Sequence, residues 1–536
     1  MIRVGILLDG LEVQAWQELA IREIENSGIA KIEALIVNQT PKSSGSKSPS
    51  LYRVFRKIDR ILFNEKLDAF QKKGVSQTKG HNIAQIKVSP VQKKFTDSFP
   101  RESLEEIKNL SLDVLIRFGF RILKGEILTA AKLGVWSFHH GDPGYYRGGP
   151  PAFWEVMNKQ AITSYVLMQL TEDLDQGPIL YQSWIQTDPL SVQRNTNRLF
   201  WASAQAPKRV LQEIHRIGIE AWKEKVSSPQ PVHKAPLWKS PGNFPMLQIG
   251  SSLMKRSIIR KWAEFSKKAH WQIGLVNDSK ADSSFSLNPG KQKTLEHPNP
   301  KRYFLADPFS IRVEGKEYLF AEEFDKKKKK GRIVWISLLD TGIQIHPVIE
   351  ESWHLSYPFI WESEGRIFLI PESSESGQIH RYQAIDFPKT WERKDVFFDQ
   401  EGYDPTVVEK DGLYWLFITQ KAHPACWPFE ELHLYWTDNL EHPQWVPHSQ
   451  SPVVSDVRQA RSAGRLFEKD GIWYRPAQDS EVRYGHQIRI QKINKWTKSE
   501  YEEDTSQIIQ ADLPALGIHT WNQTESGTWV DFYFRR

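Results

Sequence analysis

The sequence predicts two folded parts: an open parallel α/β sheet over residues 1–225 and an all-β five-bladed propeller over residues 296–536. Three observations lead to this prediction. Apolar runs alternate with helical patterns up to residue 225, a proline-rich stretch without periodicity follows, and five similar hairpin segments then repeat to the end of the sequence. A chain of 536 residues is also too long for a single hydrophobic core, so more than one domain is expected.

The first part begins with "IRVGILL" (Ile2 to Leu8), a continuous apolar run typical of a parallel strand that is buried on both faces. A helical pattern follows from Val13, and further strands are predicted at Ile32 to Asn38, Leu112 to Phe120 and around "GVWSF". This alternation predicts a parallel sheet with right-handed crossovers. The first strand is not followed by G-x-G-x-x-G, so a dinucleotide-binding site has no support.

Residues 226–295 are predicted to form a linker that contains one basic amphipathic helix. "SSPQPVHKAP" is rich in proline, and the following "SSLMKRSIIRKWAEFSKK" carries Met254, Ile258, Trp262 and Phe265 with lysine and arginine between them. Two interpretations of this helix stay open. It docks one domain against the next, or it makes a peripheral contact with an anionic membrane surface.

The second part contains five segments in which an apolar strand, a glycine turn and an aromatic-rich strand follow one another. The first is "ADPFSIRVEGKEYLFAEE" and the third is "YDPTVVEKDGLYWLFITQ". The turn glycines are Gly315, Gly365, Gly412, Gly471 and Gly527, at spacings of 50, 47, 59 and 56 residues. A hairpin repeat of about 50 residues predicts one four-stranded propeller blade per repeat.

Polar side chains recur eight residues before and seven residues after these glycines. Equivalent positions of successive blades surround the propeller axis, so a substrate-binding cluster is predicted to contain Asp307, Asp404, Glu322, Glu372 and His519. Three roles are open for it: binding sugar hydroxyls, glycosidase chemistry by an acid and a base, or capping of strand ends. The 21 tryptophans are compatible with carbohydrate-binding faces or with core packing.

A candidate catalytic pair lies in the first part. "SFHHGDPGYYRGGPP" (Ser137 to Pro151) leaves a predicted strand at its carboxyl end, where open α/β sheets bind ligands. The acidic loop "TEDLDQGPIL" follows, and it places Asp175 36 residues after His139. A histidine and an aspartate on neighbouring strand ends can transfer a proton and orient a carbonyl for attack.

Two segments resemble the formyltransferase superfamily: "RILKGEILTAAKLGVWSFHHGDPGYYRGGPPAFWEVMN" and "TSYVLMQLTEDLDQGPILYQ". The family pattern is Asn-x-His-Pro, then Arg-Gly, then Asp-x-Gly-x-Ile-Leu. His139, Arg147, Asp175 and Gly177 match it. The resemblance implies a one-carbon transferase in which an amine attacks the formyl carbon of N10-formyltetrahydrofolate, the expected co-substrate. The residues that it implies are His139, Asp175 and Ser137 for catalysis, Phe118, Gly119, Phe120, Ile122, Leu123 and Gly177 for the co-substrate, and His140 and Arg147 for the substrate.

This sequence departs from the family pattern at two positions. Ser137 stands where the family has asparagine, and His140 stands where it has proline. A serine hydroxyl offers one donor in place of the two donors of an amide. Either His140 or a water replaces the missing donor, or the domain serves another acyl transfer, or it does not catalyse.

The second part resembles the propeller at the N-terminus of plant glucosamine inositolphosphorylceramide transferases and, more distantly, five-bladed arabinanase-type glycosidases. The combined prediction is formyl transfer to an amino sugar in surface-glycan or polysaccharide biosynthesis, with the propeller holding the glycan or a partner. The alternatives are a formyltetrahydrofolate hydrolase, a propeller glycosidase and a non-catalytic glycan-binding or scaffold protein.

Composition bounds the remaining expectations. The single cysteine, Cys426, and an N-terminus that resembles a strand rather than a signal peptide predict a cytoplasmic protein. The formal net charge of +6 permits anionic partners without requiring them. No metal and no nucleic-acid partner is expected, and the oligomeric state is not predicted.

Overall fold

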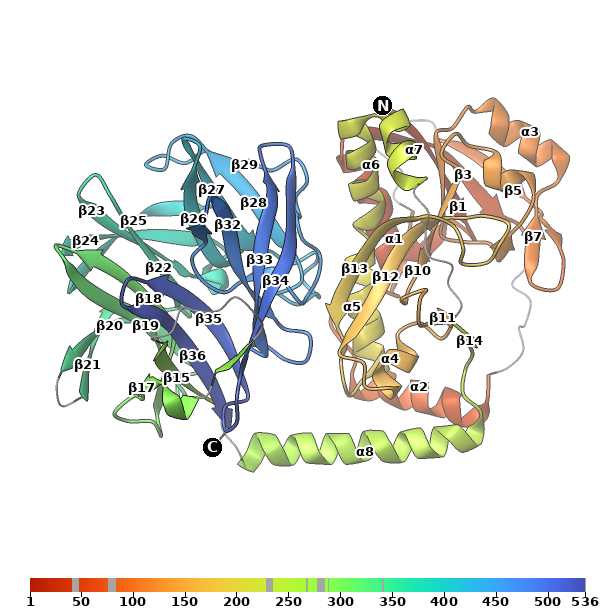
Figure 1. Ribbon diagram of the computed structural model, residues 1–536. Helices are drawn as coiled ribbons and strands as arrows, with labels where there is room; N and C mark the ends of the chain where they lie inside the picture. Colours follow the sequence, from red (N-terminus) through yellow and green to blue (C-terminus); the bar gives the residue numbers. More distant parts are fainter. Residues whose placement is uncertain are drawn as a thin grey trace. The chain divides into compact units, whose positions relative to one another are not determined.

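The computed structural model describes residues 1–40, 48–75, 83–227, 235–266, 269–276, 285–287, 289–339 and 342–535 (Figure 1). It divides into two compact units. The first contains Met1–Ser257 with Ala422–Cys426, and the second contains Ile258–Lys421 with Trp427–Arg536.

The first unit is built on a seven-stranded sheet of order β13-β12-β10-β8-β1-β3-β5. Its strands are β1 (Ile2–Leu8), β3 (Ala30–Asn38), β5 (Ala84–Val88), β8 (Val114–Arg117), β10 (Val135–His139), β12 (Ile162–Gln169) and β13 (Ile179–Gln186). The five strands from β10 to β5 pair in parallel, as the sequence predicts. Strands β12 and β13 are antiparallel and extend one edge, so the expectation of an all-parallel sheet is wrong at that edge.

Helices cover both faces of this sheet. The helices of the first unit are α1 (Ala15–Asn26), α2 (Ser50–Leu62), α3 (Arg101–Asn109), α4 (Phe153–Met157), α5 (Val192–Ser203), α6 (Ala206–Ile217), α7 (Ile219–Val226) and the start of α8 (Asn243–Ser266). α1, α5 and α6 pack on one face of the sheet and α3 on the other, whereas α2, α4 and α8 share a separate hydrophobic cluster. Successive strand residues point to opposite faces. Ile6 therefore packs with Trp16 of α1 in one core cluster, while Leu7 packs with Ile107 of α3 in another. Burial on both faces explains the uninterrupted apolar runs.

Short strands border the sheet of the first unit. They are β2 (Glu12–Gln14), β4 (Lys72–Gly74), β6 (Val91–Gln92), β7 (Thr96–Ser98), β9 (Ile122–Leu123), β11 (Arg147–Gly148) and β14 (Leu237–Trp238). β9 pairs with β7, and β11 pairs with β14. These pairings hold the loops that follow β8 and β10, where the candidate catalytic residues lie.

The described part of the second unit contains five sheets, each built mainly of antiparallel strands that follow one another along the chain. The first three comprise β18 (Tyr303–Val313), β19 (Lys316–Asp325), β20 (Lys330–Leu339) and β21 (Gly342–Ile349); β22 (Ser356–Ser363), β23 (Arg366–Glu372), β24 (Ile379–Asp386) and β25 (Thr390–Phe398); and β26 (Tyr403–Lys410), β27 (Leu413–Thr419), β28 (Leu432–Thr437) and β29 (Val446–Pro447). All five predicted turn glycines lie in hairpins and have positive φ, which confirms the repeat.

The last two sheets include strands from the predicted linker. The fourth contains β16 (Phe285–Leu287), β30 (Arg461–Ser462), β31 (Phe467–Lys469), β32 (Ile472–Asp479), β33 (Gln487–Trp496) and β34 (Tyr501–Ala511), and the fifth contains β15 (Ala269–Val276), β17 (Lys293–Leu295), β35 (Gly517–Thr524) and β36 (Gly527–Arg535). The prediction of a linker up to residue 295 is therefore wrong. β15 pairs with β36 along its whole length, so it covers a strand edge that would otherwise be unpaired.

Helix α8 differs from its prediction in its bounds and in its apolar face. It begins at Asn243, and it is anchored through Met246 and Leu253, which are buried. Met254 and Ile258 of the predicted face are exposed, and the side chains of Trp262 and Phe265 lie outside the described residues. None of the helices in the described ranges is long and apolar enough to span a membrane.

Candidate functional site

The first candidate site lies where β8 and β10 end. His139 is the last residue of β10, and its Nδ1 atom lies 3.9 Å from Oδ1 of Asp175. Oδ2 of Asp175 lies 3.8 Å from Nε of Arg147. The structure thus brings together the histidine, aspartate and arginine that the sequence predicts. All three side chains are largely buried, with 11–16% exposed.

The hydrogen bonds of His139 determine which ring nitrogen can accept a proton. Its Nε2 atom lies 2.9 Å from the carbonyl oxygen of Tyr146, and a carbonyl can only accept, so Nε2 carries the hydrogen. Nδ1 of the neutral ring then holds a lone pair that faces Asp175. A separation of 3.9 Å is too long for a direct hydrogen bond, so a reacting group or a water can lie between them.

Ser137, which replaces the family asparagine, is bound to an arginine that the sequence analysis missed. Nε and Nη2 of Arg117 donate to the Ser137 hydroxyl over 3.0 and 2.9 Å, and Nη1 donates to the carbonyls of Phe120 and Arg121. Burial lowers the pKa of Arg117, and the carboxylates of Asp9 and Asp175 oppose that shift. A charged residue at the end of a buried apolar strand was the available signal in the sequence.

His140 does not supply the missing donor. Its ring stacks on Phe200 at 3.6 Å between centroids, and its Nε2 atom lies 3.0 Å from the Ser203 hydroxyl. Burial and the neighbouring His139 lower the pKa of His140 to about 3, so the ring is neutral. His140 is half-buried, and these contacts hold its ring against α5, so its role in substrate binding stays a prediction.

The predicted co-substrate segment follows β8. The backbone amides of Phe118 and Gly119 donate to the carbonyl of Leu7, and that of Phe120 donates to Asp9. The Phe120 and Leu123 side chains are buried. These amides and side chains are already engaged within the unit, which leaves fewer groups for a ligand than the family resemblance implies.

Two further predicted co-substrate residues lie next to other chain segments. Ile122 lies in β9, beside β7. A Cβ atom on Gly177 would lie 1.7 Å from the Gln169 carbonyl oxygen, so this glycine is required for close backbone approach. Gly177 therefore positions the loop that carries Asp175.

Glu155 of α4 is a second titratable group that the sequence analysis missed. It is buried, and its Oε1 atom has no hydrogen-bond partner among the described residues. Burial raises its pKa to about 7, and the nearby Asp142 carboxylate adds to the shift. Such a carboxyl group exchanges protons near neutral pH.

The second candidate site is a buried polar cluster in the second unit. One strand in each of four sheets carries a bulge at an equivalent place before its turn glycine. The bulge lies between Ala306 and Phe309 in β18 and between Tyr403 and Thr406 in β26, with counterparts in β22 and β35. Asp307 and Asp404 have left-handed φ values of 49° at these bulges. The predicted positions eight residues before the turn glycines are thus structurally equivalent.

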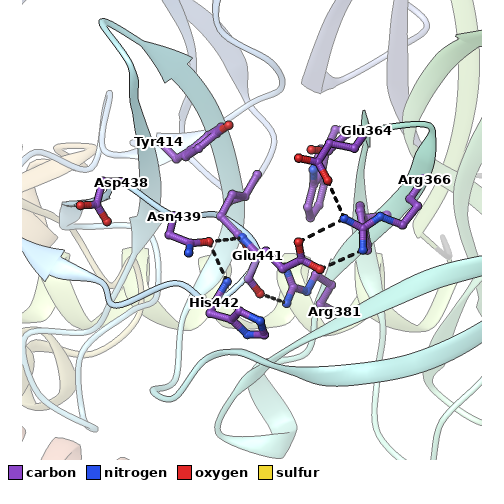
Figure 2. A pocket seen from close by; sticks show the side chains of 12 residues that line it. Glu364, Arg366, Arg381, Tyr414, Asp438, Asn439, Glu441 and His442 are labelled. Atoms are coloured by element: carbon purple, nitrogen blue, oxygen red, sulfur yellow. Dashed lines mark hydrogen bonds and ion pairs between the residues drawn. The ribbon is translucent and has the colours of Figure 1, made fainter.

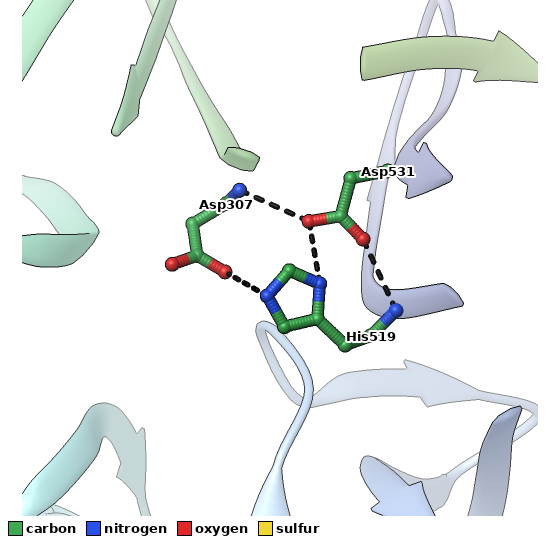
Figure 3. Close-up of side chains that lie close together, drawn as sticks. All are labelled: Asp307, His519 and Asp531. Atoms are coloured by element: carbon green, nitrogen blue, oxygen red, sulfur yellow. Dashed lines mark hydrogen bonds and ion pairs between the residues drawn. The ribbon is translucent and has the colours of Figure 1, made fainter. Parts of the chain in front are cut away.

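His519 joins the first and last repeats (Figure 3). Its Nε2 atom lies 3.2 Å from Asp307, and its Nδ1 atom lies 2.7 Å from Asp531. Burial disfavours the imidazolium ion, but the two carboxylates outweigh this and raise the pKa of His519. Burial raises the pKa of Asp307 to about 6 against the opposing effect of His519. A metal ion bound by these three residues would have to replace one of the contacts of His519.

Arg461 neutralises the other half of the cluster. It donates to both oxygens of Asp404 and to Glu372, over 2.5–3.0 Å. Burial raises the pKa of Glu372 well above its usual value, although Arg461 opposes the shift. Burial also raises the pKa of Glu322, and the nearby Asp307 carboxylate increases that shift. The five predicted residues therefore lie in one cluster. Arg461 and Asp531, which the sequence analysis missed, supply its cation and its inter-repeat bonds.

A cavity of about 550 Å³ adjoins the second and third sheets (Figure 2). It is lined by Trp361, Ser363, Glu364, Arg366, Phe368, Arg381, Tyr414, Asp438, Asn439, Leu440, Glu441 and His442. Arg366 donates to both carboxylate oxygens of Glu441, while Arg381 donates to backbone carbonyls at its base. The Trp361 indole nitrogen is buried and has no partner among the described residues. Polar groups beside aromatic rings are typical of ligand sites.

Comparisons with known proteins match the two units separately. Residues 271–529 match the family described as glucosamine inositolphosphorylceramide transferase 1, N-terminal. The protein of that name from Arabidopsis thaliana is 34% identical over 278 residues, which are 47% of this chain and 36% of that protein. The Oryza sativa subsp. japonica protein is 32% identical over 243 residues, 42% of this chain and 32% of that protein. The chain thus spans about a third of the length of these relatives.

The first unit has different relatives. Methionyl-tRNA formyltransferase from Prochlorococcus marinus (strain NATL2A) is 33% identical over 130 residues, 24% of this chain and 38% of that protein. Among solved structures, glycinamide ribonucleotide transformylase 1 from Symbiobacterium toebii matches 39% of this chain and 86% of its own, at 14% identity and a TM-score of 0.27. A family 117 glycoside hydrolase from Zobellia galactanivorans matches 50% of this chain and 90% of its own, at 13% identity and a TM-score of 0.33.

The comparisons also correct one prediction. The expected cytoplasmic location is contradicted, because the relatives of the second unit are named for inositolphosphorylceramide, which is a membrane lipid. The chain thus combines a part similar to formyltransferases with a part similar to the N-terminal region of glucosamine inositolphosphorylceramide transferases.

Proposed function

We propose that the first unit transfers a formyl group from N10-formyltetrahydrofolate to the amine of an amino sugar. The arrangement of His139, Asp175 and Arg147 at the strand ends carries this proposal. The similarity to methionyl-tRNA formyltransferases supports the reaction class. The choice of acceptor is supported by the relatives of the second unit, whose name includes glucosamine, an amino sugar.

In the proposed reaction the chain's own residues move one proton and stabilise one charge. N10-formyltetrahydrofolate would supply the formyl group. Nδ1 of His139 accepts the proton that the attacking amine loses, and Asp175 stabilises the imidazolium ion that results. The same imidazolium ion returns the proton to the departing nitrogen, so the new C–N bond forms as the old one breaks without net proton loss.

Arg117 and Ser137 are proposed to replace the family asparagine. The Ser137 oxygen accepts both Arg117 bonds, and its hydroxyl donates to the Phe138 carbonyl oxygen over a long 3.5 Å. In the proposed reaction the hydroxyl proton leaves this long contact and points to the oxygen on which negative charge develops. The adjacent guanidinium ion polarises this hydroxyl group. The Ser137 hydroxyl and the Arg117 guanidinium ion together suit a formyl oxygen. The backbone amides of Phe118, Gly119 and Phe120 already donate within the unit, so the pterin has fewer backbone donors there.

The second unit is proposed to be a five-bladed propeller that holds the glycan bearing the amine. Five sheets in the described residues, recurrent bulges and the pairing of β15 with β36 support this architecture. The cavity beside Trp361 and Tyr414 offers aromatic rings and polar groups to a sugar. The bonds of Asp307 and Asp404 to His519 and Arg461 favour a structural role for these carboxylates over glycosidase chemistry.

The test incubates the whole chain with N10-formyltetrahydrofolate and a panel of amino sugars, and it measures tetrahydrofolate release and the formylated sugar. Amine-dependent release is expected, with a loss of at least 100-fold in His139→Ala and Asp175→Asn. Asp173→Asn, in the same loop and exposed, is the matched control.

Other results would contradict the proposal in distinct ways. Release without an amine would assign the hydrolase reaction. No release and no folate binding would overturn a catalytic first unit. Sugar release from a glycan that is lost in Asp307→Asn would assign glycosidase chemistry to the second unit.

A further inference from the structure

Two helices of the first unit, α2 and α8, lie side by side (Figure 1). The backbone amide of Leu51 in α2 donates to Asn243 at the start of α8 over 3.1 Å. Tyr52 and Phe55 of α2 belong to the same hydrophobic cluster as Met246 and Leu253 of α8. Each helix therefore has an inner apolar stripe that anchors it to the first unit.

Both helices carry a second, outward apolar stripe. On α2 it consists of Val54, Ile58, Ile61 and Leu62, each at least 50% exposed and spaced by one helical turn. On α8 it consists of Phe244, Leu247 and Met254, each more than 60% exposed. These residues, with the basic residues beside them, are called the α2–α8 surface below. Such a concentration of exposed large apolar side chains marks an interaction site.

The α2–α8 surface is basic. Arg53, Lys57 and Arg60 flank the outward stripe of α2, and Lys255 follows Met254 on α8; all four are exposed. Within residues 50–62 and 243–257 the one acidic residue is Asp59, which is buried and bonded to Ser191 and to the amide of Gln193. No exposed carboxylate in these two stretches offsets the positive charge.

We propose that the α2–α8 surface binds an anionic lipid bilayer. Apolar side chains that enter the interface and basic side chains that contact lipid phosphates are the two components by which surface helices bind anionic membranes. A protein partner would have to combine an apolar groove with acidic residues around it. An anionic bilayer offers negative headgroups and an apolar interior over its whole surface. The proposal does not depend on formyl transfer.

The test measures co-sedimentation of the whole chain with vesicles of phosphatidylcholine alone and with vesicles that also contain phosphatidylglycerol. Binding to the anionic vesicles that weakens with added salt is expected. Lys57→Gln with Arg60→Gln should weaken binding to the anionic vesicles about 25-fold, at roughly fivefold per charge. Ile58→Ser with Ile61→Ser should weaken it too, and neither pair should alter the circular dichroism spectrum, since all four side chains are exposed.

Matched controls come from another exposed patch of the first unit. Val91→Ser with Phe95→Ser, and Lys93→Gln with Lys94→Gln, alter exposed apolar and basic side chains around β6 and should leave vesicle binding unchanged. Equal binding to neutral and anionic vesicles, or equal loss in the controls, would overturn the proposal. The proposal would also be overturned if the chain did not bind vesicles but associated with itself, and if Ile58→Ser with Ile61→Ser abolished that association. The α2–α8 surface would then be a protein interface.

Discussion

Replacing Arg461 by methionine should destabilise the second unit strongly. Arg461 is buried between Asp404 and Glu372, which are 1% and 5% exposed, and it donates three hydrogen bonds to them. Methionine approximates the length of the side chain but leaves two buried carboxyl groups without their cation. Breaking a buried ion pair by removing one partner costs about 3–5 kcal/mol.

The loss should depend on pH. Burial already raises the pKa of Glu372 against the opposing effect of Arg461, so removing the guanidinium ion raises it further. Glu372 then holds a proton in the folded variant that it releases when the protein unfolds. The folded variant then binds more protons than the unfolded chain, so its stability falls as the pH rises. The difference from the unmodified protein should therefore be larger at pH 8 than at pH 5.5.

Hydrogen exchange followed by mass spectrometry measures this loss within the second unit. Peptides covering β23 and β26 should exchange about 150- to 5,000-fold faster in the variant at pH 8, which corresponds to the expected loss in opening free energy. Arg312→Met is the control, since the Arg312 and Glu525 side chains are 54% and 79% exposed, and an exposed pair contributes at most about 1 kcal/mol. A change below fivefold, or an equal change at both pH values, would refute the reasoning.

Three further predictions concern buried groups and close contacts. Because the Glu155 pKa is about 7, the free energy of unfolding should fall by about 3 kcal/mol as the pH rises from 4.5 to 7. Urea unfolding of Glu155→Gln should lack this fall, and a variant with the same pH dependence as the unmodified protein would contradict the prediction. Asp531→Asn should lower the pKa of His519, because the Asp531 carboxylate no longer offsets the effect of burial on the imidazolium ion. NMR titration of the imidazole measures this pKa, and an unchanged value would contradict the prediction. Gly119→Ala should unfold or distort the first unit, because its Cβ would lie 2.3 Å from the Asp9 amide nitrogen, whereas Gly74→Ala meets nothing within 4 Å and should leave the thermal midpoint unchanged.

Local sequence patterns were sufficient for several strands of the first sheet, for the five hairpins and for much of the two sites. The turn glycines predicted five hairpins because a two-residue turn with positive φ leaves a local signature. Counting from those glycines also located Asp307, Asp404 and His519, since equivalent positions in a repeat adopt equivalent geometry. His139 and Asp175 were predicted from strand ends and a family pattern.

Contacts between residues far apart in the sequence were decided only by the tertiary structure. β15 and β36 pair although about 260 residues separate them, and neither strand carries a mark of its partner. Arg117 rather than His140 lies against Ser137 because packing turned His140 onto Phe200. Arg461 pairs with Asp404, and Asp531 pairs with His519, only because the fold brings these distant residues together. Periodicity records which face a residue occupies, but only the folded chain determines which charged groups meet there.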